Sequence, residues 1–360
     1  METKVRKTDP ITVAQLADFD EIIDVRSPAE FAEDHIPGAV SHPVLSNEER
    51  AIVGTLYKQV SDFEAKKVGA ALISRNIAYH LENHFANRPK NWRPLIYCWR
   101  GGSRSGAMAH ILNQVGWRAG KLDGGYKSYR RSVLKDLADI PAKLKLVVIC
   151  GMTGTGKSHL LQALQQQGEQ VLDLEKIALH RGSILGNIPD VAQPSQKMFD
   201  SLVWAQLRQF TADQPVYIEA ESKKVGNVRV PEQLVASMWQ SAQCLRLDTA
   251  HDLRIDLLKA DYAYYLQHPH ILKQKLSHLT ARHGHAQIQQ WQDWIDQAQW
   301  DTLISDLLTR HYDPHYTKSI TQHYPGYEQA QHLTVESISE NNWLTLAQHL
   351  IANQQPQNVI

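Results

Sequence analysis

The feature that most constrains this chain is a glycine-rich segment between a predicted strand and a predicted helix. Residues 151–158 read Gly-Met-Thr-Gly-Thr-Gly-Lys-Ser and match the pattern G-x-x-x-x-G-K-[ST] in full. The apolar run of residues 144–150 before it predicts a buried strand, and leucines at helical spacing follow it. A strand, a glycine loop and a helix in this order predict an α/β domain whose loop binds phosphate groups.

This phosphate-binding loop supplies one set of candidate site residues. They are Gly151, Gly154, Gly156, Lys157 and Ser158. Backbone N–H groups of the loop and the helix N-terminus would surround a diphosphate, Lys157 would pair with its charge, and the Ser158 hydroxyl is a candidate ligand for Mg²⁺. The motif leaves open what the phosphates are attached to.

The predicted strand at residues 216–218 is followed by two glutamates, Glu219 and Glu221. Nucleotide hydrolases generally carry an aspartate at the corresponding strand end, so these residues weaken the case for ATP hydrolysis. We treat both as candidates for an acid or a magnesium ligand. The alternative is a strand-end pair that faces solvent.

A second strand–loop–helix unit lies nearer the N-terminus and carries a cysteine. Residues 94–97 predict a strand that runs into Cys98, and the helix after the loop ends at Gly116. The loop between them contains Arg100, Gly101, Gly102, Ser103 and Arg104. Its N–H groups and arginines favour an anion and lower the pKa of a thiol, so Cys98 is a candidate nucleophile or carrier of a sulfur-family atom.

The N-terminal pattern resembles the rhodanese superfamily. The resemblance rests on Ile-Asp-Val-Arg at residues 23–26, Glu30, His-Ile-Pro-Gly-Ala at residues 35–39 and the Cys98 loop. It implies a domain that moves sulfur or selenium on its cysteine. Five residues separate Cys98 from Arg104, a loop length similar to that of the phosphatase branch of the superfamily. A cysteine-dependent phosphatase with a nucleotide-binding domain is therefore the alternative function, and a nucleotide-gated RNA-binding module with a redox-sensitive cysteine is a second one.

The predicted fold class is α/β, with an N-terminal rhodanese-like parallel-sheet domain, a P-loop α/β domain and a helical C-terminal region. We place these at residues 10–138, 142–250 and 251–360, because a proline at position 141 falls between helical and strand patterns. Strand signals fade after about residue 250. Apolar residues that share a helical face, such as Ile288, Trp291 and Ile295, replace them.

Composition narrows the class of protein further. The 360 residues are 42% hydrophobic, enough for two or three cores, and no segment is apolar for long enough to span a membrane. Three cysteines without paired spacing fit a reducing compartment, so we expect a cytoplasmic protein that does not bind membranes. The eighteen histidines are spread widely along the chain, and we interpret pairs such as His283 and His285 as ordinary surface or core residues, so we predict no metal site.

Several short segments together resemble the bacterial tRNA 2-selenouridine synthases. They are residues 53–57, 124–127, 174–175, 180–183, 193–196 and 219–222. The resemblance implies a transferase that replaces sulfur by selenium in 2-thiouridine at the wobble position, position 34, of tRNA. In the first implied step the sulfur is geranylated from geranyl diphosphate. In the second, selenophosphate supplies selenium and thiogeraniol departs.

The same resemblance implies a role for each loop. Cys98 would carry selenium as a perselenide, its loop would hold the phosphate of selenophosphate, and residues 151–158 would hold the diphosphate of geranyl diphosphate. No tightly bound cofactor is expected, Mg²⁺ is a candidate cofactor, and selenophosphate synthetase is the expected source of the selenium donor. We expect a monomer.

Binding of tRNA requires a cationic surface, and the whole chain has none in excess, with 38 basic and 38 acidic residues. Basic residues cluster locally between positions 118 and 135. Lys127, Arg130 and Arg131 are the candidate contacts, with Tyr126 and Tyr129 available for stacking on bases. The alternative is an ordinary solvated basic face.

Overall fold

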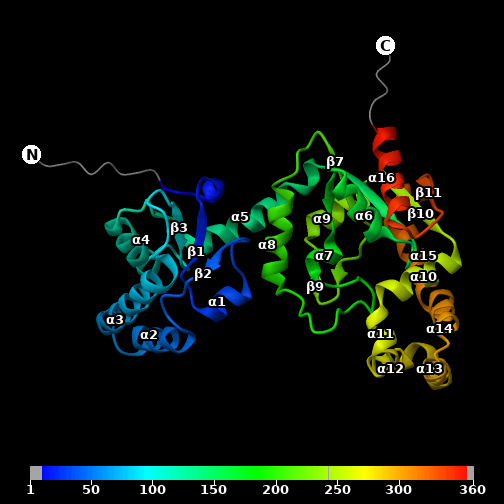
Figure 1. Cartoon of the computed structure of the whole chain (residues 1–360), viewed down its shortest axis with the longest axis horizontal. Coiled ribbons are helices and arrows are strands. Elements are labelled where there is room, and N and C mark those ends of the chain that lie inside the picture. Colours follow the sequence, from blue (N-terminus) through cyan, green and yellow to red (C-terminus); the bar gives the residue numbers. More distant parts are fainter. Residues whose placement is uncertain (1–9, 242, 355–360) are drawn as a thin grey trace, which may run out of the picture. The chain divides into compact units, whose positions relative to one another are not determined.

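The structure is a computed structural model that describes residues 10–241 and 243–354 (Figure 1). The chain forms two units, each built on a parallel sheet of its own. Unit 1 holds the residues up to Asp136 together with Ser195–Ala205, and unit 2 holds Leu137–Pro194 and the residues from Gln206 onward. The three predicted ranges are contiguous in sequence, whereas these units are not.

Unit 1 contains a four-stranded parallel sheet in the order β2-β1-β3-β4. Its strands are β1 (Glu21–Asp24), β2 (Val40–Ser41), β3 (Pro94–Tyr97) and β4 (Gly120–Lys121). Its helices are η1 (Val13–Asp18), α1 (Pro28–Glu33), α2 (Asn47–Gln59), α3 (Asp62–His80), η2 (Leu81–Phe85), α4 (Ser103–Val115) and α5 (Gly125–Asp139), the last of which runs into unit 2. The core comprises apolar side chains of β1, β3, α3 and α4.

Local sequence explains the ends of these helices. Ser27 precedes α1, Pro28 occupies its first turn, and the side chain of Glu30 accepts a hydrogen bond from the backbone N–H of Ser27. Gly116 ends α4 in the left-handed conformation, with φ of 109°, as its position in the sequence predicts. The predicted strand at residues 94–97 is confirmed as β3.

Helix α8 (Gln196–Leu207) belongs mainly to unit 1, although the phosphate-binding loop precedes it in the sequence. The Ser201 hydroxyl donates to the Asp34 carboxylate at 2.8 Å, and the ring of Trp204 lies edge-on to Tyr129. A segment that sequence patterns assign to the P-loop range therefore completes the unit that carries Cys98.

Unit 2 is built on a five-stranded parallel sheet in the order β11-β10-β5-β7-β6. Its strands are β5 (Lys145–Cys150), β6 (Gln170–Leu172), β7 (Pro215–Glu219), β10 (Cys244–Thr249) and β11 (Gln331–Val335), and β8 (Lys224–Val225) pairs with β9 (Val228–Arg229) in a small antiparallel ribbon. The helices that follow these strands early in the unit are α6 (Lys157–Gln166), α7 (Leu174–Ala178) and α9 (Glu232–Gln240), and η3 (Pro141–Lys143) precedes β5. The predicted strands at 144–150 and 216–218 are confirmed as β5 and β7.

The C-terminal region is mostly helical, and the predicted α/β fold class is confirmed. Its helices are α10 (His251–Asp261), α11 (Ala263–Gln267), α12 (Pro269–Ser277), α13 (Thr280–Asp296), α14 (Trp300–Leu307), η4 (Leu308–Tyr312), α15 (Asp313–His323), η5 (Pro325–Tyr327) and α16 (Glu340–Gln354). Ile288, Trp291 and Ile295 are buried on one face of α13, as expected.

Strand β11 was not predicted, because only Leu333 and Val335 of its five residues are buried and its apolar signal is weak. It pairs in parallel with β10, with Leu247 opposite Leu333, and extends the sheet of the P-loop. Trp343 and Leu350 of α16 join the same core as Leu160 and Leu164 of α6. Within the residues that the structure describes, no helix is both long enough and apolar enough to cross a bilayer.

Candidate functional site

Cys98 lies at the carboxyl end of β3, where the chain turns into α4. Its side chain is buried, and its sulfur lies 3.1 Å from the Ser105 hydroxyl in the first turn of that helix. The loop turns at Gly101, whose φ is +65°. The predicted sequence of strand, cysteine loop and helix N-terminus is therefore present in the structure.

The surroundings of Cys98 favour its thiolate. Burial opposes the charge, but hydrogen bonds from the Ser105 hydroxyl and from the N–H groups of Ser105 and Arg100, together with the charge of Arg104, outweigh it, and the pKa of the thiol lies below its ordinary value. Arg104 is held 2.8 Å from Glu30, whereas Arg100 is exposed. Sequence reasoning did not select Ser105 as a site residue. Its position in the first turn of the predicted helix could have indicated that its hydroxyl reaches the Cys98 sulfur.

The N-terminus of α5 closes the other side of the cysteine loop. The N–H of Tyr126 donates to the Cys98 carbonyl at 2.8 Å, and the N–H of Lys127 donates to the Trp99 carbonyl at 3.0 Å. A Cβ on Gly125 would lie 2.3 Å from the Cys98 carbonyl oxygen, so only glycine permits this approach. The loop shape thus depends on a helix that begins more than twenty residues later in the chain.

The candidate tRNA contacts on α5 have different surroundings. Lys127 and Arg131 are exposed, whereas Arg130 pairs with Asp200 and donates to the Lys197 carbonyl at 3.0 Å. Tyr126 and Tyr129 are buried, which contradicts the expectation that they stack on bases. The exposed aromatic ring beside Cys98 is that of Trp99, which stacks on Tyr126 with ring centres 5.2 Å apart.

The phosphate-binding loop lies between β5 and α6 with the geometry that its motif predicts. Gly154 and Gly156 have φ of +77° and +89°, and a Cβ on Gly156 would lie 2.2 Å from the Trp343 ring. The Lys157 ammonium donates to the Gly151 carbonyl at 2.8 Å. The Gly151 N–H donates to the Tyr316 hydroxyl at 2.6 Å.

Three carboxyl groups surround the end of this loop. Ser158 donates to Glu175 at 3.3 Å, and Glu219 accepts from the Glu175 N–H at 3.0 Å. Burial and mutual repulsion raise the pKa of all three carboxyls, Glu175, Glu219 and Glu221, that of Glu221 to about 8. Glu219 is buried and joins the start of α7, while Glu221 lines the cavity above the loop, so the two predicted glutamates have different positions.

That cavity measures about 350 Å³ and contains both positive and negative side chains. Lys157, Arg181, Glu175 and Glu221 all line it. Sequence reasoning did not select Glu175 or Arg181 as site residues, although both lie in segments noted for their family resemblance. Both residues lie outside the loop motif, so the motif does not predict that their side chains reach the phosphates.

A second, apolar pocket adjoins the first, and Thr153, Ser183, Leu258, Tyr262 and Tyr312 line both. Beyond these shared residues, aliphatic and aromatic side chains from α11, α12 and α14 and the segments beside them form its wall. The space inside it measures about 60 Å³. A phosphate site with an apolar pocket beside it fits a ligand that has an anionic head and a hydrocarbon tail.

Comparison with known families separates the two units. The family described as "Rhodanese-like domain" matches residues 10–132, and the family described as "tRNA 2-selenouridine synthase AAA domain" matches residues 144–340, more than half of the chain. The chain belongs to the tRNA 2-selenouridine synthase family. The resemblance carried by its short segments is thereby confirmed.

Curated relatives carry the same name. A tRNA 2-selenouridine synthase of Nitrosomonas europaea is 34% identical, over 71% of this chain and 66% of the relative. That of Aeromonas salmonicida is 31% identical over 82% of this chain and 86% of the relative, and that of Shewanella halifaxensis is 29% identical over 86% and 93%. The match thus spans just under two thirds of the Nitrosomonas relative and most of the other two.

Proposed function

We propose that the protein modifies tRNA by replacing the sulfur of wobble 2-thiouridine with selenium. In the first step the sulfur attacks C1 of geranyl diphosphate, a carbon–sulfur bond forms and diphosphate leaves. In the second step the phosphorus–selenium bond of selenophosphate breaks, water takes the phosphoryl group as phosphate, the selenium bonds to C2 of the base, and the bond between C2 and sulfur breaks to release thiogeraniol. Alkylation makes the sulfur a better leaving group, which is why it precedes the exchange.

The adjacent pockets of unit 2 are the observation that carries the first step. Lys157 and Arg181 supply positive charge for the diphosphate, and the apolar pocket at Leu258 and Tyr262 supports binding of the geranyl chain next to it. A cavity of about 150 Å³ holds benzene, so a space of about 60 Å³ must widen to take a ten-carbon chain. Side-chain rotation along the wall of α14 is the simplest route.

The oxygen ligands near the loop fit Mg²⁺, which prefers carboxylate, hydroxyl and phosphate oxygens. Glu175 and Glu221 have raised pKa values because they are partly removed from water and their charges repel one another, and a cation would reduce that penalty. Ser158, Glu175 and Glu221 would hold the ion, which neutralises charge on the departing diphosphate. The chain's own cations, Lys157 and Arg181, orient the diphosphate.

The second step rests on Cys98. Its depressed pKa increases the fraction of thiolate, and the N–H groups of its loop favour an oxyanion such as the phosphate of selenophosphate. We assign to this thiolate the transfer of selenium from selenophosphate to the base. Selenophosphate synthetase is the proposed source of the selenophosphate. Lys127 and Arg131 on α5 are the exposed cations that support tRNA binding by the same unit.

Reconstitution with 2-thiouridine tRNA, geranyl diphosphate and selenophosphate tests the proposal. Lys157→Ala should lower the rate of geranylation at least 100-fold, about 2.7 kcal/mol of transition-state binding. Cys98→Ala should abolish selenation of a tRNA that already carries the geranyl group. Lys318→Ala, which alters an exposed lysine of α15, is the matched control and should leave both steps unchanged. Unimpaired geranylation by Lys157→Ala contradicts the assignment of the loop.

Ligand binding separates a prenyl site from a nucleotide site. Five extra carbons buried at about 0.8 kcal/mol each predict that geranyl diphosphate binds at least ten times more tightly than dimethylallyl diphosphate. ATP that binds more tightly than either ligand favours a nucleotide-binding role. Rapid Cys98-dependent hydrolysis of an aryl phosphate favours the phosphatase, although Arg104 is already paired with Glu30.

A further inference from the structure

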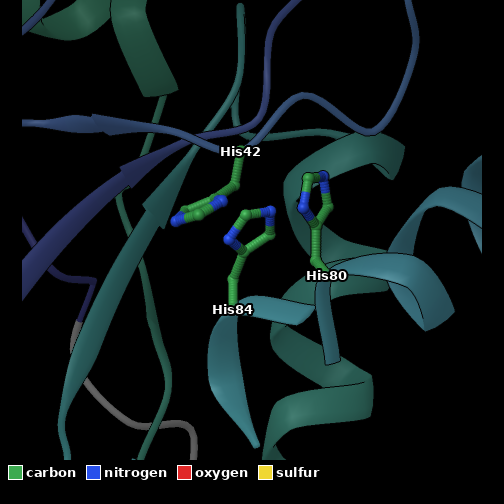
Figure 2. Close-up of side chains that lie close together, drawn as sticks. All are labelled: His42, His80 and His84. Atoms are coloured by element: carbon green, nitrogen blue, oxygen red, sulfur yellow. The ribbon is translucent and has the colours of Figure 1, made fainter. Parts of the chain in front are cut away.

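Three histidines of unit 1 lie together although the sequence separates them. His42 follows β2, His80 ends α3, and His84 lies in the π-helical turn η2. One ring nitrogen from each lies within 4.8 Å of those of the other two. Figure 2 shows the three imidazole rings grouped, with His42 coming from a loop and His80 and His84 from helical backbone.

We propose that His42, His80 and His84 form a binding site for a divalent transition-metal ion of the zinc class. The prediction that the chain has no metal site rested on spacing along the sequence, and His42 lies 38 positions before His80. His80 and His84 are four residues apart, which places them on one side of a helical segment. The third ligand comes from a different element, as in many three-histidine zinc sites.

The hydrogen bonds of His80 support the proposal. Its Nε2 lies 2.9 Å from the Pro43 carbonyl, and since a carbonyl only accepts, Nε2 must carry the proton. The lone pair is therefore on Nδ1, which is buried and has no partner among the residues that the structure describes. A metal-bound histidine commonly donates its other ring N–H to a backbone carbonyl, the arrangement seen at His80.

A second histidine group shows what a self-satisfied cluster looks like. In unit 2, His283 and His311 are hydrogen-bonded to each other, with Nε2 and Nδ1 3.0 Å apart. That contact pairs one ring nitrogen of each imidazole without an ion. In the group of His42, the rings make packing contacts with centroids 4.9 Å to 5.5 Å apart, and the orphan nitrogen of His80 remains.

The three imidazole rings need to move only slightly to bind a zinc ion. Two nitrogens on a tetrahedral zinc ion lie about 3.3 Å apart when each Zn–N bond is about 2.0 Å. Nitrogens within 4.8 Å of one another reach that spacing by shifts of the order of 1 Å. His84 is exposed, so water can occupy the fourth position. Imidazole ligands favour zinc, copper or nickel over magnesium or calcium.

The nearby charges do not oppose a cation strongly. Arg88 is the basic residue beside His42, and it pairs with Glu21 at 2.7 Å. The ion would join the loop after β2 to the end of α3. That loop includes Val44 and Leu45 of the unit 1 core, so metal binding should stabilise this unit.

Zinc titration of the untagged, full-length protein tests the site. We expect binding of one equivalent, a rise in the melting temperature of the zinc-loaded protein, and at least tenfold weaker binding in His84→Ala. His84 is exposed, so this variant should fold as the parent does, which circular dichroism without metal checks. His110→Ala, which alters an exposed histidine of α4, is the matched control and should bind zinc normally.

Cobalt substitution distinguishes the histidines from the thiols. An imidazole site gives ligand-field bands without a thiolate charge-transfer band, and His84→Ala should weaken them. Absence of saturable binding, binding that His84→Ala leaves unchanged, or a thiolate band that disappears in Cys98→Ala would each overturn the proposal. None of these results depends on activity toward tRNA, so the metal site and the proposed function fail independently.

Discussion

The Cys98 loop and the phosphate-binding loop share a backbone plan but differ in the charges that face them. Each follows a buried parallel strand, turns through a glycine with positive φ and ends at a helix N-terminus. Around Cys98, hydroxyl and N–H donors and Arg104 depress the pKa of a thiol. Around the phosphate-binding loop, Glu175 and Glu221 are partly buried and repel one another, and their pKa values rise.

A strand–loop–helix unit therefore provides an anion site, while residues distant in sequence decide which chemistry the site supports. One loop supports a reactive nucleophile. The other combines cations for a diphosphate with carboxylates that fit a metal ion. Three experiments test this contrast.

Gly156→Ala should destabilise unit 2 by about 3 kcal/mol. The new methyl group would clash with the Trp343 ring, and the alanine backbone would be strained at positive φ. Urea denaturation measures the free energy of unfolding. Gly168→Ala is the control: its φ of +87° nearly equals the +89° of Gly156, but nothing lies within 4 Å of its Cβ. The control should lose only about 1 kcal/mol. Equal losses in the two variants mean that the fit against Trp343 is unimportant.

Glu221→Gln should stabilise the protein at high pH by about 2 kcal/mol, less than half of what the pKa shift alone corresponds to, because the carboxyl is partly exposed to solvent. The folded carboxyl has a pKa of about 8 against an ordinary 4.5, so the folded state binds more protons between these values. Stability therefore decreases as pH rises through this window, and the penalty is complete above pH 8. Urea unfolding at about pH 6 and about pH 9 measures it.

The exposed Glu336→Gln should leave this pH dependence as it is. Mg²⁺ should reduce the difference between wild type and Glu221→Gln if the carboxylates bind the ion. An identical pH slope in wild type and Glu221→Gln contradicts the assigned charge repulsion.

Ser105→Ala should raise the pKa of Cys98 by about 1 unit, since a hydrogen bond to a charged group contributes about 1.5 kcal/mol. The pH profile of alkylation by a small iodoacetamide reagent, followed at the Cys98 peptide by mass spectrometry, measures the shift. Cys150 and Cys244 serve as internal controls because they lie in unit 2. An unchanged profile shows that the N–H groups and Arg104 suffice for the thiolate.

Sequence alone predicted both loops, because each is encoded within about ten consecutive residues. Gly151 to Ser158 and Cys98 to Arg104 have the glycines that permit the turns and the polar groups that face an anion. The strands on either side were predictable for a similar reason, as continuous apolar runs of a parallel sheet. Strand β11 was not, since its pattern is too weak to distinguish from the helices around it.

The groups that surround those loops could not be predicted from local sequence, because folding brings them together from distant positions. Ser201 reaches Asp34 from 167 positions away, Tyr316 reaches the N–H of Gly151 from 165 positions away, and His42 meets His80. Burial and proximity of this kind set the pKa values of Glu175 and Glu221 and the orphan nitrogen of His80. Sequence determines local backbone and donor type, but electrostatic environment depends on distances between elements, which exist only once the chain has folded.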